Sequence, residues 1–297
     1  MKKAYMYVGI GIALCIILLV VSKQYWLPLD ETVVKYFPLD DTKQLEQSST
    51  SLTLLSESDK DEYDIQWKTN STLAEPIYLR QDISLLYANG HLRGILSKWK
   101  ESGQNVALEL NVHGEDSGHY QAVTYHHGEV HYPDDKIKSI QDMSQAELYV
   151  VDSPMTPLES FQKPENNTQS EWKKTLDHAT NQQLLYEWNQ LINHFQIPKN
   201  DYESIPLTSL PDYISKPFPQ LNQQQTQQVI GQLWEGLYKN YVLDFAVESQ
   251  KSSDQTFKSY IPLILADKGG THLLVIYENS KGKKIKLTQR YPDSPKD

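Results

Sequence analysis

The sequence predicts an α+β protein in which an N-terminal transmembrane helix and a flexible stalk precede antiparallel β-meanders and two long amphipathic helices. Three observations predict this class. Residues 4–21 contain no charged side chain. Apolar and polar residues alternate over much of residues 63–151, and apolar residues recur near every 3.6 positions in two later segments. A chain of 297 residues is long enough for one large domain or two small ones beyond the helix.

The apolar run from Ala4 to Val21 predicts a single-pass membrane anchor, assigned with its flanks to residues 1–26, because a spanning helix needs about 17–25 predominantly apolar residues. Lys2 and Lys3 precede the run. Positive residues stay on the cytoplasmic side, so we expect a cytoplasmic N-terminus and an extracytoplasmic body in a bacterial cell membrane. The alternative is a cleaved signal peptide, although the small-x-small cleavage pattern is missing.

Charge and cysteine content restrict what the body can bind. Cys15 is the only cysteine and lies inside the apolar run, so the body has no disulfide and no thiolate metal site. Without Lys2, Lys3 and Lys23, the rest of the chain has 25 basic and 38 acidic residues, a net charge of −13. We therefore expect no nucleic acid partner, because affinity for the phosphate backbone depends on positive charge.

The stretch after the anchor, residues 27–62, is polar and acidic and predicts a juxtamembrane stalk. Residues 63–154 predict a mainly β domain. The pair Asn89-Gly90 stands between apolar runs and predicts a hairpin turn, since both residues tolerate positive φ. A further turn is expected at His127-Gly128.

Residues 168–297 predict an α+β domain of two helices followed by a three-stranded β-meander. Thr168 to Glu171 fits a capping box for the first helix, and the second helix is expected to begin near Asn222. The expected strands are residues 260–265, 271–277 and 284–290. The alternative organisation joins this domain and residues 63–154 in one combined domain.

Five of the nine histidines lie between His113 and His131, interleaved with carboxylates. If the flanking strands pair, His113 and His119 face each other across a loop. Imidazole nitrogen is a common ligand of zinc and copper, which take three or four ligands. His113, His119 and His127 are therefore the candidate ligands of a zinc or copper ion. The alternative is that these histidines are ordinary members of a polar strand face.

No motif in the sequence predicts catalytic residues or a nucleotide cofactor, since the P-loop, the G-x-S-x-G elbow and HExxH are all missing. This favours a non-enzymatic binding or regulatory module with a protein partner or another ligand in the cell envelope. One alternative is an envelope hydrolase or metal-dependent enzyme that uses the region from His113 to His131. Another is a structural component of a membrane complex, joined through the Gly9 and Gly11 face of the anchor.

Overall fold

The computed structural model describes residues 34–55, 62–153, 156–249 and 257–292. The predicted anchor, residues 1–26, lies outside the described residues. Within the described ranges, no helix combines the length and the apolar character needed to cross a bilayer.

The fold is mostly β, with 50% strand and 26% helix. The first sheet has six strands: β1 (Gln47–Leu55), β2 (Tyr63–Ala88), β3 (His91–Gly114), β4 (Gly118–His131), β5 (Ile137–Ser153) and β6 (Thr156–Phe161). The second sheet has the order β10-β9-β8-β7, formed by β7 (Tyr202–Pro206), β8 (Leu263–Asp267), β9 (His272–Glu278) and β10 (Lys284–Arg290). The helical segments are α2 (Asn167–His194), η1 (Lys199–Asp201), η2 (Leu207–Ile214), α3 (Gln223–Leu237), η3 (Tyr238–Val242) and α4 (Leu243–Ser249).

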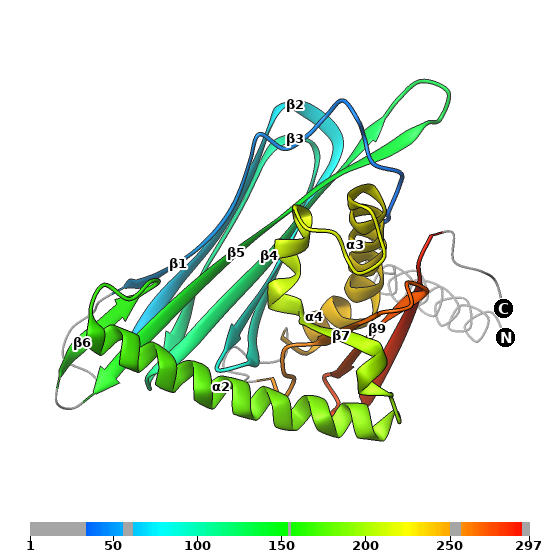
Figure 1. The fold of residues 1–297 in the computed structure, drawn as a ribbon. Coiled ribbons are helices and arrows are strands. Elements are labelled where there is room, and N and C mark those ends of the chain that lie inside the picture. The colour runs from blue at the N-terminus through cyan, green and yellow to red at the C-terminus, as the bar shows by residue number, and fades with distance from the viewer. Residues whose placement is uncertain (1–33, 56–61, 154–155, 250–256, 293–297) are drawn as a thin grey trace, which may run out of the picture. The chain divides into compact units, whose positions relative to one another are not determined.

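A long hairpin that bends in its middle brings the first sheet close to a closed barrel (Figure 1). β2 and β3 pair along most of their length, but the register shifts around Pro76. Proline has no N–H to contribute to a ladder, so the pairing breaks there. On the facing strand, Ser102 takes a positive φ of 48°. The two halves of the hairpin then lie face to face, and the Ser71 hydroxyl of the first half donates to Asp82 of the second at 2.6 Å.

The registers place β1 and β4 one after the other along the same edge of β2. β1 pairs with residues 64–72 of β2, and β4 pairs with residues 79–88, while β3 runs along the opposite edge. β5 continues the sheet beyond β4. One wall of the barrel is therefore made of β1 and the first half of the hairpin, and the other wall of the second half with β4 and β5.

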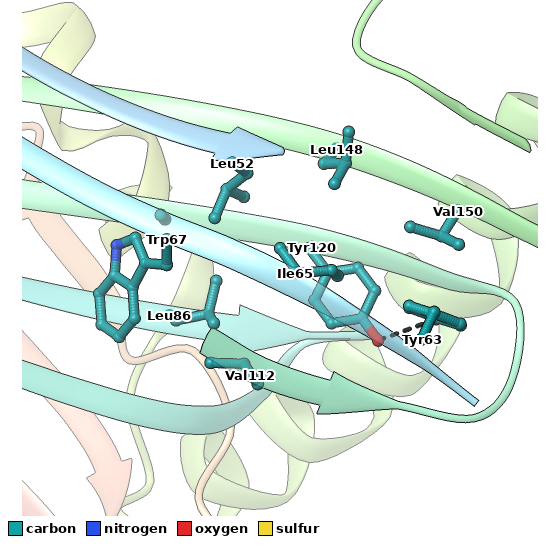
Figure 2. Packing of buried hydrophobic residues seen from close by; sticks show 10 residues of the cluster. Leu52, Tyr63, Ile65, Trp67, Leu86, Val112, Tyr120, Leu148 and Val150 are labelled. Atoms are coloured by element: carbon teal, nitrogen blue, oxygen red, sulfur yellow. Dashed lines mark hydrogen bonds between the residues drawn. The ribbon is translucent and has the colours of Figure 1, made fainter. Parts of the chain in front are cut away.

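An apolar cluster fills one end of the barrel (Figure 2). Leu52, Ile65 and Trp67 come from the first wall, and Leu86 and Tyr120 come from the second. A smaller apolar cluster fills the barrel near the bend, formed by Leu73, Ile77, Val130 and Ile140. Each cluster removes apolar surface from water, which is the main source of stability for such a fold. The interior between the clusters is polar.

The outer face of the second wall packs against helical segments. The rings of Tyr125 on β4 and Trp234 on α3 stack with their centroids 5.1 Å apart. The Trp188 indole of α2 donates to the backbone carbonyl of Ile261 at 2.8 Å, which ties α2 to the chain entering β8. Period-two alternation therefore gives β4 one side chain for the barrel interior and the next for the helices.

The predicted α+β class, with two long amphipathic helices beside β-meanders, is wrong, because the nearly closed barrel-like sheet dominates the fold. The predicted strands were short, whereas β2 and β3 contain 26 and 24 residues. α2 also leaves Leu185 and Tyr186 exposed, so it is not a helix with one clean apolar face. The helices cover a β structure instead of forming half of the domain.

Of three local predictions, one turn and one helix cap are confirmed and one capping box is wrong. The Asn89-Gly90 turn is confirmed, with φ values of 49° and 82°. Asn222 caps α3 in a capping box with Gln225, as expected for a helix beginning there. The capping box predicted at residues 168–171 is wrong, because Asn166 caps α2 and accepts from the Gln169 amide.

Two further predictions differ from the structure in the first half of the chain. The predicted turn at His127-Gly128 is wrong, since both residues continue β4. A Cβ at Gly128 would lie 2.4 Å from Ile77 Cδ1 and 3.2 Å from Arg80 Cδ, so this glycine makes room first for the Ile77 side chain and also for Arg80. The predicted stalk, residues 27–62, contains the ordered strand β1. Within β1, Ser48 donates to the Asp142 carboxylate, and Thr50 bonds to the hydroxyls of Thr124 and Ser144 inside the barrel.

Candidate functional site

The structure does not bring the three predicted metal ligands together. His119 and His127 share one face of β4, but eight residues separate them, which is about 26 Å along a strand. His113 lies on β3, where its exposed imidazole is 3.3 Å from Asp64 and 3.6 Å from Glu62. Each histidine therefore has its own surroundings.

His127 is packed in the interior of the protein. Its Nε2 lies 3.3 Å from the Ser139 hydroxyl, and its ring stacks near Tyr125. Burial, together with the nearby Arg80 guanidinium, lowers the pKa of His127 from 6.5 to about 4. The imidazole is therefore neutral at pH 7.

His119 belongs to a cluster where β4, β5 and α2 meet, which we call the His119 cluster: His119, Glu147, Tyr149, Lys173 and Asp177. The His119 Nε2 is 2.6 Å from Glu147 Oε1, and its Nδ1 is 3.6 Å from Asp177 Oδ1. The imidazole stacks on the Tyr149 ring at 4.4 Å. The strand pairing of His119 with Tyr149 positions these groups, and α2 supplies the others.

Electrostatics within the His119 cluster favour the charged form of Glu147. Burial acts to raise the pKa of Glu147, but the hydrogen bond from His119 and the charge of Lys173 leave this pKa below its usual value. Burial and the acceptor Asp177 raise the pKa of Tyr149, so its hydroxyl stays a donor. Lys173 Nζ is 2.9 Å from Asp177 and 4.0 Å from Glu147. The site thus combines two anions, one ammonium and one imidazole.

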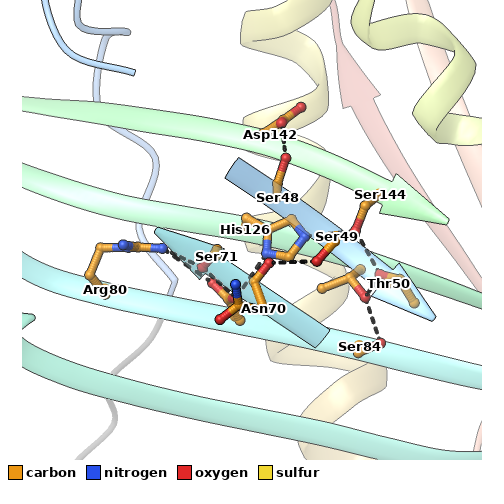
Figure 3. Close-up of polar contacts among 12 residues, drawn as sticks. Ser48, Ser49, Thr50, Asn70, Ser71, Arg80, Ser84, His126, Asp142 and Ser144 are labelled. Carbon is orange, nitrogen blue, oxygen red and sulfur yellow. Dashed lines mark hydrogen bonds and ion pairs between the residues drawn. The ribbon is translucent and has the colours of Figure 1, made fainter. Parts of the chain in front are cut away.

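The second polar site lies inside the barrel and was not predicted (Figure 3). Asp82 Oδ2 is 2.8 Å from His126 Nδ1, and His126 Nε2 is 2.8 Å from the Ser144 hydroxyl. Arg80 and Asp82 have 0% exposed side chains, with 3.8 Å between their charged groups. The Arg80 guanidinium also donates to the Ser71 hydroxyl, and to the Gln104 carbonyl at 3.0 Å. We call this set the interior network.

Hydroxyl groups extend the interior network toward Trp67. The indole N–H can only donate, and it does so to Ser84 at 3.1 Å. Ser84 can then donate to Thr124 at 2.7 Å, Thr124 to Thr50 at 2.6 Å, and Thr50 to Ser144 at 2.6 Å. This order leaves the Ser144 proton for His126. The strand registers Ser84–Thr124–Ser144 explain why these groups meet.

The order Ser144–His126–Asp82 is that of a hydrolytic triad, but its surroundings give it a different role. Asp82 and His126 are fully buried, and the Ser144 hydroxyl is shared with Thr50. The barrel interior supplies hydrogen-bond partners to most polar atoms of the network, as buried polar groups require, whereas Arg80 Nε and Asp82 Oδ1 have none. Sequence reasoning missed it because alternating residues 80, 82 and 84 resemble a solvent-facing strand face.

The third feature is the outer edge of β3. Within the described residues, β2 is the strand that pairs with residues 96–110 of β3, and no other strand pairs with them. Leu110 shares its strand face with the buried Val106 and Val112, yet it is 42% exposed. Leu96 lies only partly buried against the same interior cluster. We call residues 96–110 of β3 the open edge.

Comparison with known proteins does not assign the chain to a family. No protein-family model matches the chain, and no curated protein matches it. The chain is similar to a protein from Arabidopsis thaliana whose structure was determined in solution, with 13% identity over 43% of this chain and 91% of that one. The TM-score of 0.25 is too low to indicate a shared fold.

Proposed function

We propose that this chain is a bacterial membrane-anchored protein whose extracytoplasmic body is a non-enzymatic binding module. Its partner would be a protein of the cell envelope that adds an extended segment to the open edge of β3. The observation that supports this most directly is Leu110, an inward-facing leucine that the described residues leave 42% exposed.

The chemistry of the open edge favours an extended peptide over other ligands. An unpaired strand edge offers a row of backbone N–H and C=O groups to a further strand. Leu96, Leu108 and Leu110 are half-buried or exposed apolar side chains along it. A segment with an apolar residue at every second position would satisfy the backbone groups and cover these leucines in one step. Trp99, also exposed, adds an aromatic contact on the other strand face.

Replacing Leu110 by aspartate is expected to abolish partner binding while lowering the free energy of unfolding by about 1 kcal/mol, because the side chain is only partly buried. A photo-crosslinking residue at position 108 should capture an envelope protein in intact cells, and Leu110→Asp should remove that adduct. The matched control is the same probe at the exposed Lys163. Equal adducts at 108 and 163, or an adduct that survives Leu110→Asp, would contradict the proposal.

The anchor in this proposal rests on residues 4–21 of the sequence. The full chain should stay with the membrane after alkaline extraction, and protease added outside the cell should digest the body. N-terminal sequencing distinguishes the anchor from a cleaved signal peptide, because an anchored chain retains Lys2 and Lys3. Recovery of the chain in the soluble fraction, or a body protected from external protease, would count against the assigned topology.

A further inference from the structure

We infer that the His119 cluster is a divalent-metal site of the zinc class, with His119 and Asp177 as ligands. This inference is independent of the open edge. His119 comes from β4 and Asp177 from α2, so a bound ion would link the barrel to the long helix that crosses it.

The lone pair on His119 Nδ1 carries the argument. The side chain is only 5% exposed, and Nδ1 has no hydrogen-bond partner. Glu147 Oε1 lies 2.6 Å from Nε2 and can accept a hydrogen bond from it, and in the neutral tautomer that donates this bond the lone pair is on Nδ1. A carboxylate that holds the far N–H of an imidazole is the usual second partner of a metal-bound histidine. His119 Nδ1 lies 3.6 Å from Asp177 Oδ1, a separation at which both atoms can contact the same ion.

The donor set indicates which cations fit. One ligand atom each from His119, Glu147 and Asp177 can be chosen so that all lie within 4.8 Å of one another. Glu147 can therefore act as a third ligand or as the partner of Nε2. Imidazole nitrogen with carboxylate oxygen suits zinc, whereas magnesium and calcium take oxygen ligands almost exclusively.

The Lys173 ammonium lies beside Asp177, where the bound cation would also lie. Its ammonium is 2.9 Å from Asp177 and contacts the Tyr149 hydroxyl, but its side chain is 32% exposed. The lysine can therefore rotate into solvent when a dication binds. Two carboxylates and one ammonium leave the site with excess negative charge when His119 is neutral, which favours a dication. Lys173 is thus a competitor for the ion, and its removal should tighten metal binding.

The test is calorimetric titration of ZnCl₂ into the full chain in detergent micelles. We expect about one zinc per chain and a rise in melting temperature on zinc addition. His119→Gln and Asp177→Asn should each weaken zinc binding more than about tenfold. Lys173→Met should strengthen it, and MgCl₂ should produce no comparable heat. His113→Gln, at an exposed histidine in a different carboxylate cluster, is the matched control and should leave zinc binding unchanged.

Two outcomes would overturn the inference. If neither the parent chain nor Lys173→Met binds zinc at one equivalent, the cluster is an ion-pair group only. If zinc binding is lost in His113→Gln but kept in His119→Gln, the metal belongs to the exposed cluster on β3. Circular dichroism of each variant shows whether it is folded, and Lys173→Met separates a gain of affinity from a general loss of structure.

Discussion

Replacing Arg80 by methionine is expected to lower the free energy of unfolding by about 3–5 kcal/mol, the cost of breaking a buried ion pair. Methionine matches the arginine stem in length but removes the donors to Ser71 and Gln104 and the positive charge 3.8 Å from Asp82. The Asp82 carboxylate then remains buried without a compensating cation. Urea unfolding followed by tryptophan fluorescence measures the change.

A double-mutant cycle separates this cost from lost packing. Asp82→Asn removes the carboxylate charge, so Arg80→Met combined with Asp82→Asn should be less destabilised than the sum of the single variants. The exposed pair of Lys68 and Glu109, 3.4 Å apart, is the control, and breaking it should cost about 1 kcal/mol or less. Strict additivity in the Arg80–Asp82 cycle would show that the charges do not interact.

His127 should make the protein less stable as the pH falls from 7 to 4. The folded state holds the pKa of His127 at about 4, whereas its ordinary value is 6.5. Between pH 6.5 and about 4, His127 is protonated in the unfolded chain but neutral in the folded protein. The free energy of unfolding therefore falls as the pH is lowered through this range. A difference of this size corresponds to about 3 kcal/mol. Unfolding free energies measured across this range give the slope.

The comparison that isolates His127 is the same titration of two variants. His127→Gln keeps a polar side chain beside Ser139 but cannot titrate, so its stability should vary less with pH than that of the parent. His113→Gln, at an exposed histidine on β3, is the control for removing an imidazole elsewhere in the protein. A His127→Gln curve parallel to the parent curve would assign the pH dependence to other groups.

The sequence predicted the local features of this fold better than its architecture. The Asn89-Gly90 turn and the cap at Asn222 depend on a few neighbouring residues, and both are confirmed. Closure of the barrel depends on the bend around Pro76, where two strand halves separated by several residues face each other. In a sequence, a proline next to polar residues is typical of the end of a short strand, so the long hairpin was not predicted.

In the candidate sites, too, local sequence identified single residues but not the partners that distant strands and helices supply. His119 was predicted from its type and neighbours, but its partners Glu147 and Asp177 come from β5 and α2, far along the chain. No local pattern contains that information. His126, adjacent to a predicted ligand, was passed over because its burial depends on β1 covering the sheet. Leu110 alternates with polar residues like any strand residue, and only the barrel geometry shows that this inward-facing side chain is left 42% exposed.

The interior network also acts against misalignment of strands. Asp82, His126 and Asp142 occupy one rung across β2, β4 and β5, and Leu86 and Ala122 occupy another. Sliding β4 by one residue would reverse every side chain on it, sending His126 toward the helices and His127 into the barrel. The slide that brings Tyr125 opposite Asp82 would leave this buried carboxylate without an imidazole partner. An apolar interior would tolerate such a register shift more readily, so the polar residues of this rung favour one strand alignment during folding.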